Sequence, residues 1–361
     1  MLEILTRQLA AATPLDDGQI HRAVAWLADE TISAASKADF LIAFAQKGET
    51  PAEIAAFARA LREKSIQPPL DAETRAQEIL DIVGTGGDRL GTFNISTTTA
   101  ILCAAAGVIV AKHGNRAVTS QAGSADVLEA LGIRIDLTPE AAAHSLREKK
   151  FAFFFAPNFH PAFKHIGPAR KLCAERGQRT IFNLLGPLLN PARPSAMLMG
   201  VPRTEWCEPL AQVLQTLGVR RAMVVCGKVP NPAAHLPPDG SSGERAAAFF
   251  LDELSTLGEN TIAEFYQERG FTVSTTLPEQ FPLQAATLED LRGSDKFQNA
   301  KIVRQILHGE ERGPKRDAVL LNAGAALFVA GKTRSLAEGW DLAAETIDSR
   351  RAEAKLLELA S

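Results

Sequence analysis

A strand, a glycine-rich turn and a helix follow one another directly in the first third of this chain, and this order strongly restricts the possible folds. Residues 78–83, EILDIV, have the apolar pattern of a buried strand, and residues 96–107, STTTAILCAAAG, have that of a helix. The residues between them, GTGGDRLGTFNI, therefore form a turn between the carboxyl end of a strand and the amino end of a helix. Ligands of α/β proteins bind at such turns.

The turn has the composition of an anion-binding site. Because glycine lacks a Cβ atom, Gly84, Gly86 and Gly87 let backbone N–H groups approach a bound anion closely. The side chains that add hydrogen-bonding groups beside the positive amino end of the helix are Asn94, Ser96 and Thr97. The sequence therefore predicts a phosphorylated ligand at this turn.

The same order recurs in the next unit of the chain. Residues 108–111, VIVA, lead into the polar loop KHGNRAVTSQAGSAD, which opens the helical pattern DVLEALG. In this loop Lys112, His113 and Arg116 offer donors, and Asn115 offers both a donor and an acceptor. Either loop by itself could be a structural turn or a solvated loop. Two such loops at the same end of neighbouring parallel strands favour a ligand with many oxygen atoms.

The periodicity of the sequence changes near residue 70. The expected helices before this point are residues 2–11, 16–30, 36–46 and 50–64. In the last of them Thr50 is the expected cap, Pro51 lies in the first turn and Glu53 completes a capping box. After this point short apolar runs alternate with helical patterns. The runs that we expect to form strands are residues 78–83, 108–111, 133–137, 151–155, 197–201 and 221–226.

These patterns predict the α/β class, with a small all-helical N-terminal domain and a larger domain whose mostly parallel central sheet is flanked by helices. We place the helical domain at residues 1–70, joined by a helical segment near 165–190, and the α/β domain at residues 71–361. A chain of 361 residues is long enough for one large domain and a smaller companion.

Composition argues against several classes of protein. A formal net charge of −3 lacks the basic excess of a protein that binds nucleic acid nonspecifically. No apolar run reaches membrane-spanning length, and the first residues lack the apolar core of a signal peptide. The cysteines, Cys103, Cys173, Cys207 and Cys226, have no CxxC spacing and lie in or beside apolar segments. We therefore expect reduced core thiols in a cytoplasmic protein that binds neither nucleic acid nor membrane.

Several separated motifs make the chain resemble the anthranilate phosphoribosyltransferase family. Besides GTGGD, NIST, KHGNR and GSADVLEALG, they are FAPNFHPAFKH (155–165), RTIFNLLGPLLNPA (179–192), LDELS (251–255) and GPKRDAVLLNAGAALFVAG (313–331). The motifs follow the family's order nearly from end to end, which is far more specific than GTGGD alone.

The resemblance implies an enzyme of tryptophan biosynthesis that transfers the 5-phosphoribosyl group from phosphoribosyl pyrophosphate to the amine of anthranilate and releases pyrophosphate. It also implies Mg²⁺ as cofactor, held by Ser96, Asp252 and Glu253 together with the pyrophosphate, and a homodimer formed through the helical domain. The transition state carries positive charge on the sugar and negative charge on the leaving group. Charge stabilisation and positioning are therefore the main needs, and we assign no general acid or base.

The matching motif positions imply two groups of substrate contacts in the α/β domain. Phosphoribosyl pyrophosphate would lie against Gly84, Gly87, Asp88, Thr92, Asn94, Ser96, Thr97, Lys112, Ser120 and Ser124. Anthranilate would lie against Gly84, His113, Asn115, His160 and Arg170, with the arginine paired to its carboxylate. Without the flanking motifs, Arg170 would suit a surface ion pair, His160 a packed core position and the Asp-Glu pair a solvated loop.

Two insertions depart from the family pattern. The first lies near residues 171–178, within KLCAERGQRT. The second, GKVPNPAAHLPPDGSSGERAAA, falls within residues 228–249, just before LDELS, and its proline, glycine and serine content predicts a long surface excursion. Both border the expected substrate cleft, and neither removes a motif residue.

Two other functions remain as alternatives. A nucleoside phosphorylase of related architecture would also bind phosphate in glycine-rich turns, but KHGNR and the Asp-Glu pair favour pyrophosphate with Mg²⁺. A noncatalytic relative that binds nucleic acid should have lost these residues and gained Lys and Arg, and this chain shows neither change.

Overall fold

The computed structural model describes residues 2–117, 121–230, 248–267 and 269–361. Its helices are α1 (Leu2–Ala10), α2 (Asp17–Ala28), α3 (Ala34–Lys47), α4 (Pro51–Glu63), α5 (Ala72–Ala76), α6 (Ile95–Ala105), α7 (Ser124–Ala130), α8 (Pro139–Lys149), α9 (Ala156–Phe159), α10 (Phe163–Glu175), α11 (Phe182–Leu185), α12 (Cys207–Thr216), α13 (Lys296–Leu307), α14 (Pro314–Val329), α15 (Leu336–Asp348) and α16 (Arg351–Ala360). Its strands are β1 (Ile79–Gly84), β2 (Ile109–Gly114), β3 (Phe151–Phe155), β4 (Ala196–Gly200), β5 (Arg221–Val229), β6 (Phe249–Leu251), β7 (Asn260–Tyr266) and β8 (Arg269–Thr276). Ser120 and most of the second insertion lie outside the described residues.

The first four helices confirm the periodicity of the N-terminal sequence. At the start of α4, Thr50 Oγ1 accepts from Glu53 N at 3.2 Å and Glu53 Oε2 accepts from Thr50 N at 3.0 Å, which is the expected capping box. Asp16 and Gln19 cap α2 in the same way. Because these side chains satisfy N–H groups that a helix leaves unpaired, the helix starts are fixed by local sequence.

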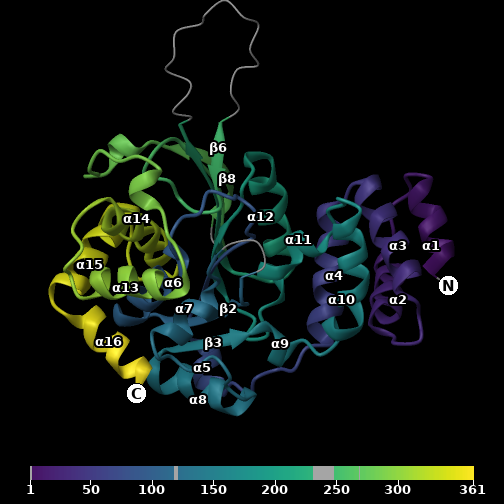
Figure 1. Ribbon diagram of the computed structural model, residues 1–361, viewed down its shortest axis with the longest axis horizontal. Helices are drawn as coiled ribbons and strands as arrows, with labels where there is room; N and C mark the ends of the chain where they lie inside the picture. Colours follow the sequence, from purple (N-terminus) through teal and green to yellow (C-terminus); the bar gives the residue numbers. More distant parts are fainter. Residues whose placement is uncertain (1, 118–120, 231–247, 268) are drawn as a thin grey trace, which may run out of the picture.

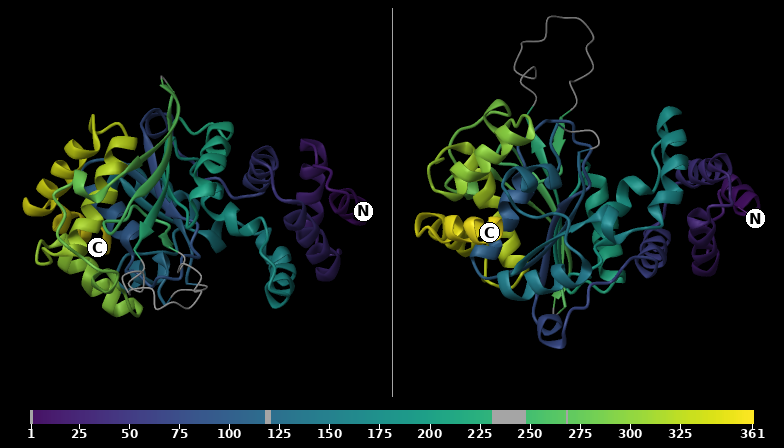
Figure 2. Two further views of the ribbon diagram at one scale, coloured as in Figure 1. Left: turned by 90° about the horizontal axis from the view of Figure 1, so that it is seen from above. Right: turned by 60° about the horizontal axis from the view of Figure 1, so that its bottom comes forward.

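The described strands form one eight-stranded sheet with the order β3-β2-β1-β4-β5-β7-β8, and β6 pairs with β5. Strands β1 to β5 run parallel, whereas β6, β7 and β8 pair antiparallel. Helices cover both faces of the sheet, as Figures 1 and 2 show. The predicted α/β class with a mostly parallel sheet is confirmed. Since β1 lies between β2 and β4, the turns that follow these three strands share one edge.

Five of the six expected strands are present, as β1 to β5, and the strand expected at residues 133–137 is wrong. In that segment Ile133 and Ile135 are buried while Arg134 and Asp136 are exposed, but the backbone pairs with no strand. The apolar alternation thus reflects burial against the core on one side, which does not require a ladder of hydrogen bonds.

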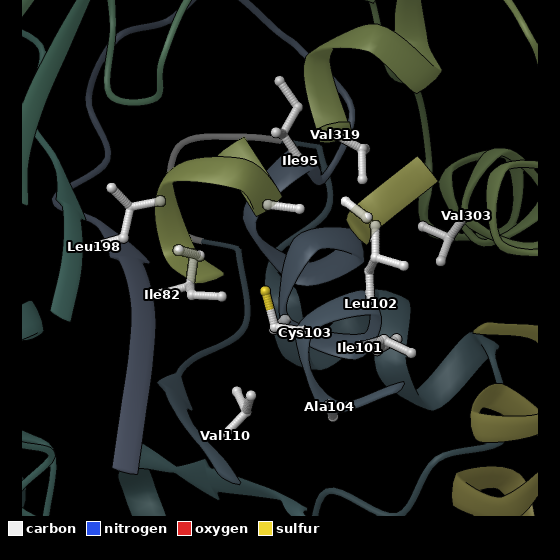
Figure 3. Close-up of a cluster of buried hydrophobic side chains, with 14 of the residues drawn as sticks. Ile82, Ile95, Ile101, Leu102, Cys103, Ala104, Val110, Leu198, Val303 and Val319 are labelled. Atoms are coloured by element: carbon white, nitrogen blue, oxygen red, sulfur yellow. The ribbon is translucent and has the colours of Figure 1, made fainter. Parts of the chain in front are cut away.

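Alternate residues of the central strands face different hydrophobic clusters. Ile82 of β1 and Leu198 of β4 join the cluster around α6, which Figure 3 shows in close-up. Met197 and Met199 of β4 point to the other face and join the cluster that contains α12 and the N-terminal helices. Because both faces are buried, the strands are apolar throughout, as is typical of parallel sheets.

A helix from the middle of the chain packs with the N-terminal helices on one side of the sheet (Figure 1). This helix, α10, packs against α2 and α3, and α12 packs against both α4 and β5. Lys37 Nζ donates to Asp29 O at 2.6 Å and to His165 O at 2.9 Å, which ties α3 to the first turn of α10. Segments far apart in sequence therefore build the helical side of the molecule.

The four cysteines are buried free thiols, as expected. Burial raises the pKa of the Cys103 thiol well above its usual range, so it stays protonated. Among the described helices, none combines the length and the apolar character needed to cross a membrane.

Candidate active site

The turn after β1 meets the acidic segment 252–255 at the carboxyl edge of the sheet. Gly86 N donates to Asp252 Oδ2 at 2.7 Å. A Cβ atom at Gly84 would collide with the Asp252 carboxylate, and one at Gly200, the last residue of β4, would collide with the Asp252 backbone. Glycine at these two positions is what allows the aspartate to enter the turn.

Asp88, Asp252 and Glu253 bring three carboxyl groups together. Burial and the neighbouring carboxyl groups of Asp88 and Glu253 raise the pKa of Asp252 well above its usual range. Burial likewise raises the pKa of Asp88, and it raises the pKa of Glu253 to about 7 although the Lys112 ammonium opposes this shift. Because close carboxylates repel one another, a cation in this cluster would stabilise their ionised forms.

Ser96 and Lys112 border the acid cluster. Ser96, in the first turn of α6, donates its N–H to Glu253 Oε1 at 3.1 Å. Lys112, on β2, donates from Nζ to Ile82 O at 2.7 Å and to Ser96 Oγ at 3.4 Å. Burial lowers the pKa of the Lys112 ammonium. Lys112 and the hydroxyl of Ser96 thus lie at the amino end of α6, where an anion would bind.

The donor set suits a hard divalent cation such as Mg²⁺. Carboxylate and hydroxyl oxygens are its preferred ligands, and it commonly uses one or two carboxylates together with phosphate oxygens and water. In the part of the chain that the structure describes, no group of three or more His, Cys, Asp or Glu side chains could hold a metal ion. Ser96 N–H is bonded to Glu253 Oε1 at 3.1 Å, and the carboxyl groups of Asp88 and Glu253 are near enough to Asp252 to help raise its pKa.

Two buried asparagines fix the acidic segment. Asn322 of α14 accepts from Leu254 N and donates to Leu254 O, both at 3.0 Å. Asn260 of β7 accepts from Ser255 N at 2.6 Å and donates to Ser255 O at 2.9 Å. Sequence reasoning assigned neither asparagine a role. The sequence feature that could have indicated a role for Asn322 is its position as a lone amide in the apolar helix of the GPKRDAVLLNAG motif.

The glycine-rich turn adopts the backbone conformation that its sequence predicts. Gly86 and Gly87 have φ of 73° and 91°, in the left-handed region that favours glycine. Asn94 Nδ2 donates to Ala122 O at 3.2 Å, and its Oδ1 accepts from Asn299 Nδ2 at 2.9 Å. Asn299, on α13, is a further buried amide to which sequence reasoning gave no role. It anchors Asn94 between the two predicted loops.

Thr92 and Thr97, both expected to contact substrate, differ in their surroundings. Thr92 forms an isolated antiparallel bridge with Arg292. Thr97 is fully buried, and its Oγ1 has no hydrogen-bond partner among the described residues. A buried hydroxyl without a partner is unfavourable, so Thr97 has an unused donor at the amino end of α6.

The second loop is only partly available for a ligand. Asn115 is exposed, and its Oδ1 accepts from Arg116 N at 2.8 Å. Arg116, an expected donor, instead pairs with Asp126 and Glu129 of α7, both at 3.0 Å. Ser124 is the first residue of α7. The cationic group of this loop that lies at the acid cluster is therefore Lys112.

His113 and His160 form a buried pair, with their Nε2 atoms 3.1 Å apart. Burial and the neighbouring His160 ring lower the pKa of His113 to about 3, and burial lowers the pKa of His160 to about 4. The His113 ring also hydrogen-bonds to the Gly186 backbone. Since a neutral imidazole has one donor and one acceptor, His113 Nε2 accepts from His160 Nε2–H. His160 Nδ1 is then a lone-pair acceptor, and it has no partner in the described part of the chain.

A row of aromatic rings connects this pair to Arg170. His160 packs edge-on against Phe163 with ring centroids 5.6 Å apart, and Phe163 packs edge-on against Phe182 at 5.5 Å. The Arg170 guanidinium lies over the Phe182 ring, 5.3 Å from its centroid. Arg170 and His160 thus stand at opposite ends of one aromatic surface. An aromatic carboxylate would match this surface, because its ring can pack against the aromatic side chains and its carboxylate can pair with the Arg170 guanidinium.

A buried hydrogen-bond network lies beneath the histidine pair. Asp81, on β1, accepts from His113 N at 3.3 Å and from Asn190 Nδ2 at 2.8 Å. Asn190 Nδ2 also donates to Ala111 O at 2.7 Å. Burial raises the pKa of Asp81 to about 6. Sequence reasoning missed Asp81 because it reads as one polar residue inside an apolar strand.

Other cavities lie at the opposite, amino edge of the sheet. One, of about 560 Å³, is bordered by Arg220, Arg221 and Tyr266, near the start of β5. Another, of about 360 Å³, is bordered by Arg62 and Arg193. Neither includes a residue expected to bind substrate.

Two family models match this chain. A family model described as "Glycosyl transferase family, a/b domain" matches residues 76–234 and 244–353, and one described as "Glycosyl transferase family, helical bundle domain" matches residues 3–65. The two matches lie on the α/β part and on the N-terminal helices.

Several relatives that share the same name match nearly the whole chain. Anthranilate phosphoribosyltransferase of Symbiobacterium thermophilum is 44% identical over 352 residues, covering 97% of this chain and 94% of the relative. The crystal structure of the enzyme from Thermus thermophilus has a TM-score of 0.83 and 41% identity, covering 98% of each chain. The Saccharomyces cerevisiae enzyme, in complex with PRPP and Mg, has a TM-score of 0.83 and 25% identity, covering 99% of this chain and 96% of the other. The chain thus belongs to the anthranilate phosphoribosyltransferase family of the glycosyltransferases.

Proposed function

We propose that the chain transfers the 5-phosphoribosyl group from phosphoribosyl pyrophosphate to the amine of anthranilate, giving N-(5-phosphoribosyl)anthranilate and pyrophosphate in tryptophan biosynthesis. The observation that supports this proposal is the position of Asp252 against Gly84 and Gly200, which brings the acid cluster to the glycine-rich turn. The relatives, with identities of 44% and 41%, share this activity by name.

Phosphoribosyl pyrophosphate would bind along the glycine-rich turn and the amino end of α6. The left-handed Gly87, which has no side chain, would let the backbone approach phosphate closely, and the unused Thr97 hydroxyl and the Lys112 ammonium would add donors. The proposed contacts are Gly84, Gly87, Asp88, Thr92, Asn94, Ser96, Thr97, Lys112, Ser120 and Ser124. Ser120 rests on the motif alone.

Mg²⁺ would be held by Ser96, Asp252 and Glu253, with pyrophosphate oxygens completing its shell. The donor set fits, since it is made of hard oxygens, and burial together with the neighbouring carboxyl groups of Asp88 and Glu253 raises the pKa of Asp252. When bound, the cation would neutralise negative charge that develops on the leaving pyrophosphate. Ser96 N–H, bonded to Glu253 Oε1 at 3.1 Å, would orient the glutamate. The S. cerevisiae relative is described with PRPP and Mg.

Anthranilate would lie along the aromatic row, with its carboxylate at Arg170 and its ring near His160 and His113. The proposed contacts are Gly84, His113, Asn115, His160 and Arg170. Since His113 and His160 have lowered pKa values, both rings are neutral near pH 7 and do not add a charge that would attract or repel the amine. The reaction is then promoted by holding the amine and sugar together, and no group needs to act as general acid or base.

Three further properties follow from the family and are proposed here. Residues 1–70, with the helical segment near 165–190, would form one domain, and residues 71–361 the substrate-binding domain. The chain would act in the cytoplasm, where its buried thiols stay reduced. It would form a homodimer through its N-terminal helices.

The decisive experiment incubates the purified protein with anthranilate, phosphoribosyl pyrophosphate and Mg²⁺ and follows the loss of anthranilate fluorescence. We expect turnover that stops when EDTA removes the metal. A folded sample that leaves anthranilate unchanged at saturating substrates contradicts the proposal. Parallel reactions with a nucleoside and inorganic phosphate, and binding to nucleic acid, test the two alternatives, and we expect both to be negative.

A further inference from the structure

A second anion site is indicated at the amino edge of the sheet, away from the acid cluster. The cavity of about 360 Å³ lies between α4, which contributes Arg59, Arg62 and Glu63, and two segments of the α/β part. These segments are the turn before β4, with Arg193, and the turn after α12, with Gly218. The cavity thus joins the helical side to the sheet. Its volume is within the range that holds small organic ligands.

Arg62 is a buried cation that contacts no acidic side chain in the part of the chain that the structure describes. Only 6% of the residue is exposed, and Nε donates to Leu188 O at 2.6 Å. Nη2 has no hydrogen-bond partner among the described residues. Burial, followed by repulsion from Arg193, lowers the pKa of Arg62 to about 10, and attraction to Asp81 only partly opposes this shift. A buried charge that lacks a paired ion is costly.

The other groups of the cavity do not neutralise Arg62. Arg59 pairs with Asp17 at 2.8 Å, on the exposed side of the helices. Glu63, which borders the cavity, has a side chain that is 59% exposed and approaches His21 at 3.6 Å. Positive charge therefore exceeds negative charge around the cavity.

Arg193 is held in an unusual backbone conformation at the rim of the cavity. Its φ of 50° lies in the left-handed region, which a residue with a side chain seldom adopts. Its N–H donates to Asn190 O at 3.1 Å, so the turn is fixed by the Asn190 network. Strained residues that the surrounding structure holds in place occur often at ligand-binding sites.

We propose that this cavity binds a small phosphorylated molecule, whose phosphate bridges Arg62 of α4 and Arg193 of the turn before β4. Guanidinium groups recognise phosphate with paired hydrogen bonds, and two arginines against one exposed glutamate favour a dianion over a single carboxylate. The ligand would satisfy the free Nη2 of Arg62. Because its contacts come from both α4 and the sheet, it would stabilise one arrangement of the helical side against the α/β part.

The test uses inorganic phosphate in calorimetric titrations of the wild type and two variants. Arg193→Asn removes the rim charge, and asparagine tolerates the left-handed backbone. Arg350→Asn is the matched control, since Arg350 also has a positive φ, of 65°, and is exposed on the far side of the fold at the start of α16. Phosphate that binds at the candidate active site contributes equally to all three proteins. We expect Arg193→Asn to lose one class of site, or to weaken it by about tenfold or more, and the control to match the wild type.

A crystal soaked in tungstate, a heavy analogue of phosphate, locates the anion by its anomalous signal. We expect a peak within hydrogen-bonding distance of Arg62 Nη2 in the wild type and in Arg350→Asn. Identical titrations for all three folded proteins, or tungstate found at the glycine-rich turn alone, would overturn the proposal. If Arg193→Asn proves unfolded by circular dichroism, Arg193→Gly also removes the rim charge and tolerates the left-handed backbone, and the same loss of phosphate binding is expected of it. These measurements do not depend on catalytic activity, so they stand apart from the proposed function.

Discussion

Two residues of the acid cluster, Asp252 and Glu253, give the most direct prediction about catalysis. Replacing Asp252 and Glu253 together by Asn and Gln preserves size but removes both negative charges that would hold Mg²⁺. We expect the fold to survive, the turnover rate to fall by orders of magnitude and the Mg²⁺ requirement to shift upward. Turnover measured against Mg²⁺ concentration checks this. The matched control is Glu310→Gln with Glu311→Gln, an adjacent acidic pair between α13 and α14. A titration curve like that of the wild type would place the metal elsewhere.

Arg170 is expected to select the second substrate. Truncating a charge-assisted contact in a partly desolvated site costs about 2 to 5 kcal/mol. Arg170→Ala should therefore raise the KM for anthranilate strongly and that for phosphoribosyl pyrophosphate little. Lys171→Ala, at the next and exposed position of α10, is the control and should change neither. Equal effects of Arg170→Ala on both KM values would mean that the arginine has a structural role.

The buried histidine pair predicts a specific dependence of stability on pH. The folded state holds His113 and His160 neutral, with pKa values of about 3 and 4, whereas histidine in the unfolded chain titrates near 6.5. The unfolded state thus binds more protons below pH 6.5, so the contribution of the pair is fully present above that pH and is lost as the pH falls through about 4 for His160 and about 3 for His113.

Each histidine should contribute a slope of up to about 1.4 kcal/mol per pH unit to the unfolding free energy in this window. His160→Gln should reduce the slope, as measured by urea unfolding at a series of pH values. His144→Gln, on the exposed face of α8, should leave it unchanged. A slope that is the same in all three proteins would contradict the lowered pKa of His160.

Among the elements, α14 is the support on which the acidic segment rests. Asn322→Ala leaves Leu254 N and O without their partner in a buried place, which costs about 1 to 3 kcal/mol. We expect a lower unfolding free energy and, because the segment carries Asp252 and Glu253, a weaker apparent affinity for Mg²⁺ in turnover assays. Gln298→Ala removes an exposed amide from α13 and should be neutral in both. If Asn322→Ala lowers the stability but leaves the Mg²⁺ dependence unchanged, α14 does not position the metal-binding residues.

Sequence patterns predicted elements well where local chemistry defines them. The capping box at Thr50 and Glu53 and the strand–turn–helix order around Gly84 are local features, and the structure has both. The alternation at residues 133–137 was misleading because one-sided burial produces the same pattern as strand pairing. Whether such a segment joins a sheet depends on whether a neighbouring edge is free, which no local pattern reveals.

At the scale of the whole molecule, the N-terminal helices present the surface proposed for dimerisation. Ile4 on α1 is 64% exposed although Leu2 and Leu5 beside it are buried. Ile4→Asp should convert a dimer to a monomer, because a charge cannot be buried there without a partner. Light scattering after size exclusion measures this. Leu357→Asp, at a residue 62% exposed on α16, is the control and should stay dimeric. If both variants remain dimeric, the interface does not lie on α1.

The sequence by itself determined the α/β class, the two donor-rich turns and the family, because glycine, capping and apolar periodicity act over a few neighbouring residues and the motifs can be recognised directly. It also named Asp252 and Glu253 before any contact was known. Only the tertiary structure decided that Asp252 enters the turn between Gly84 and Gly200, that Asn322 fixes the acidic segment, and that Arg62 Nη2 is buried without a hydrogen-bond partner among the described residues. These facts depend on contacts between residues far apart in the sequence, such as Gly86 with Asp252 and Leu254 with Asn322, which meet only when the sheet brings strand ends together.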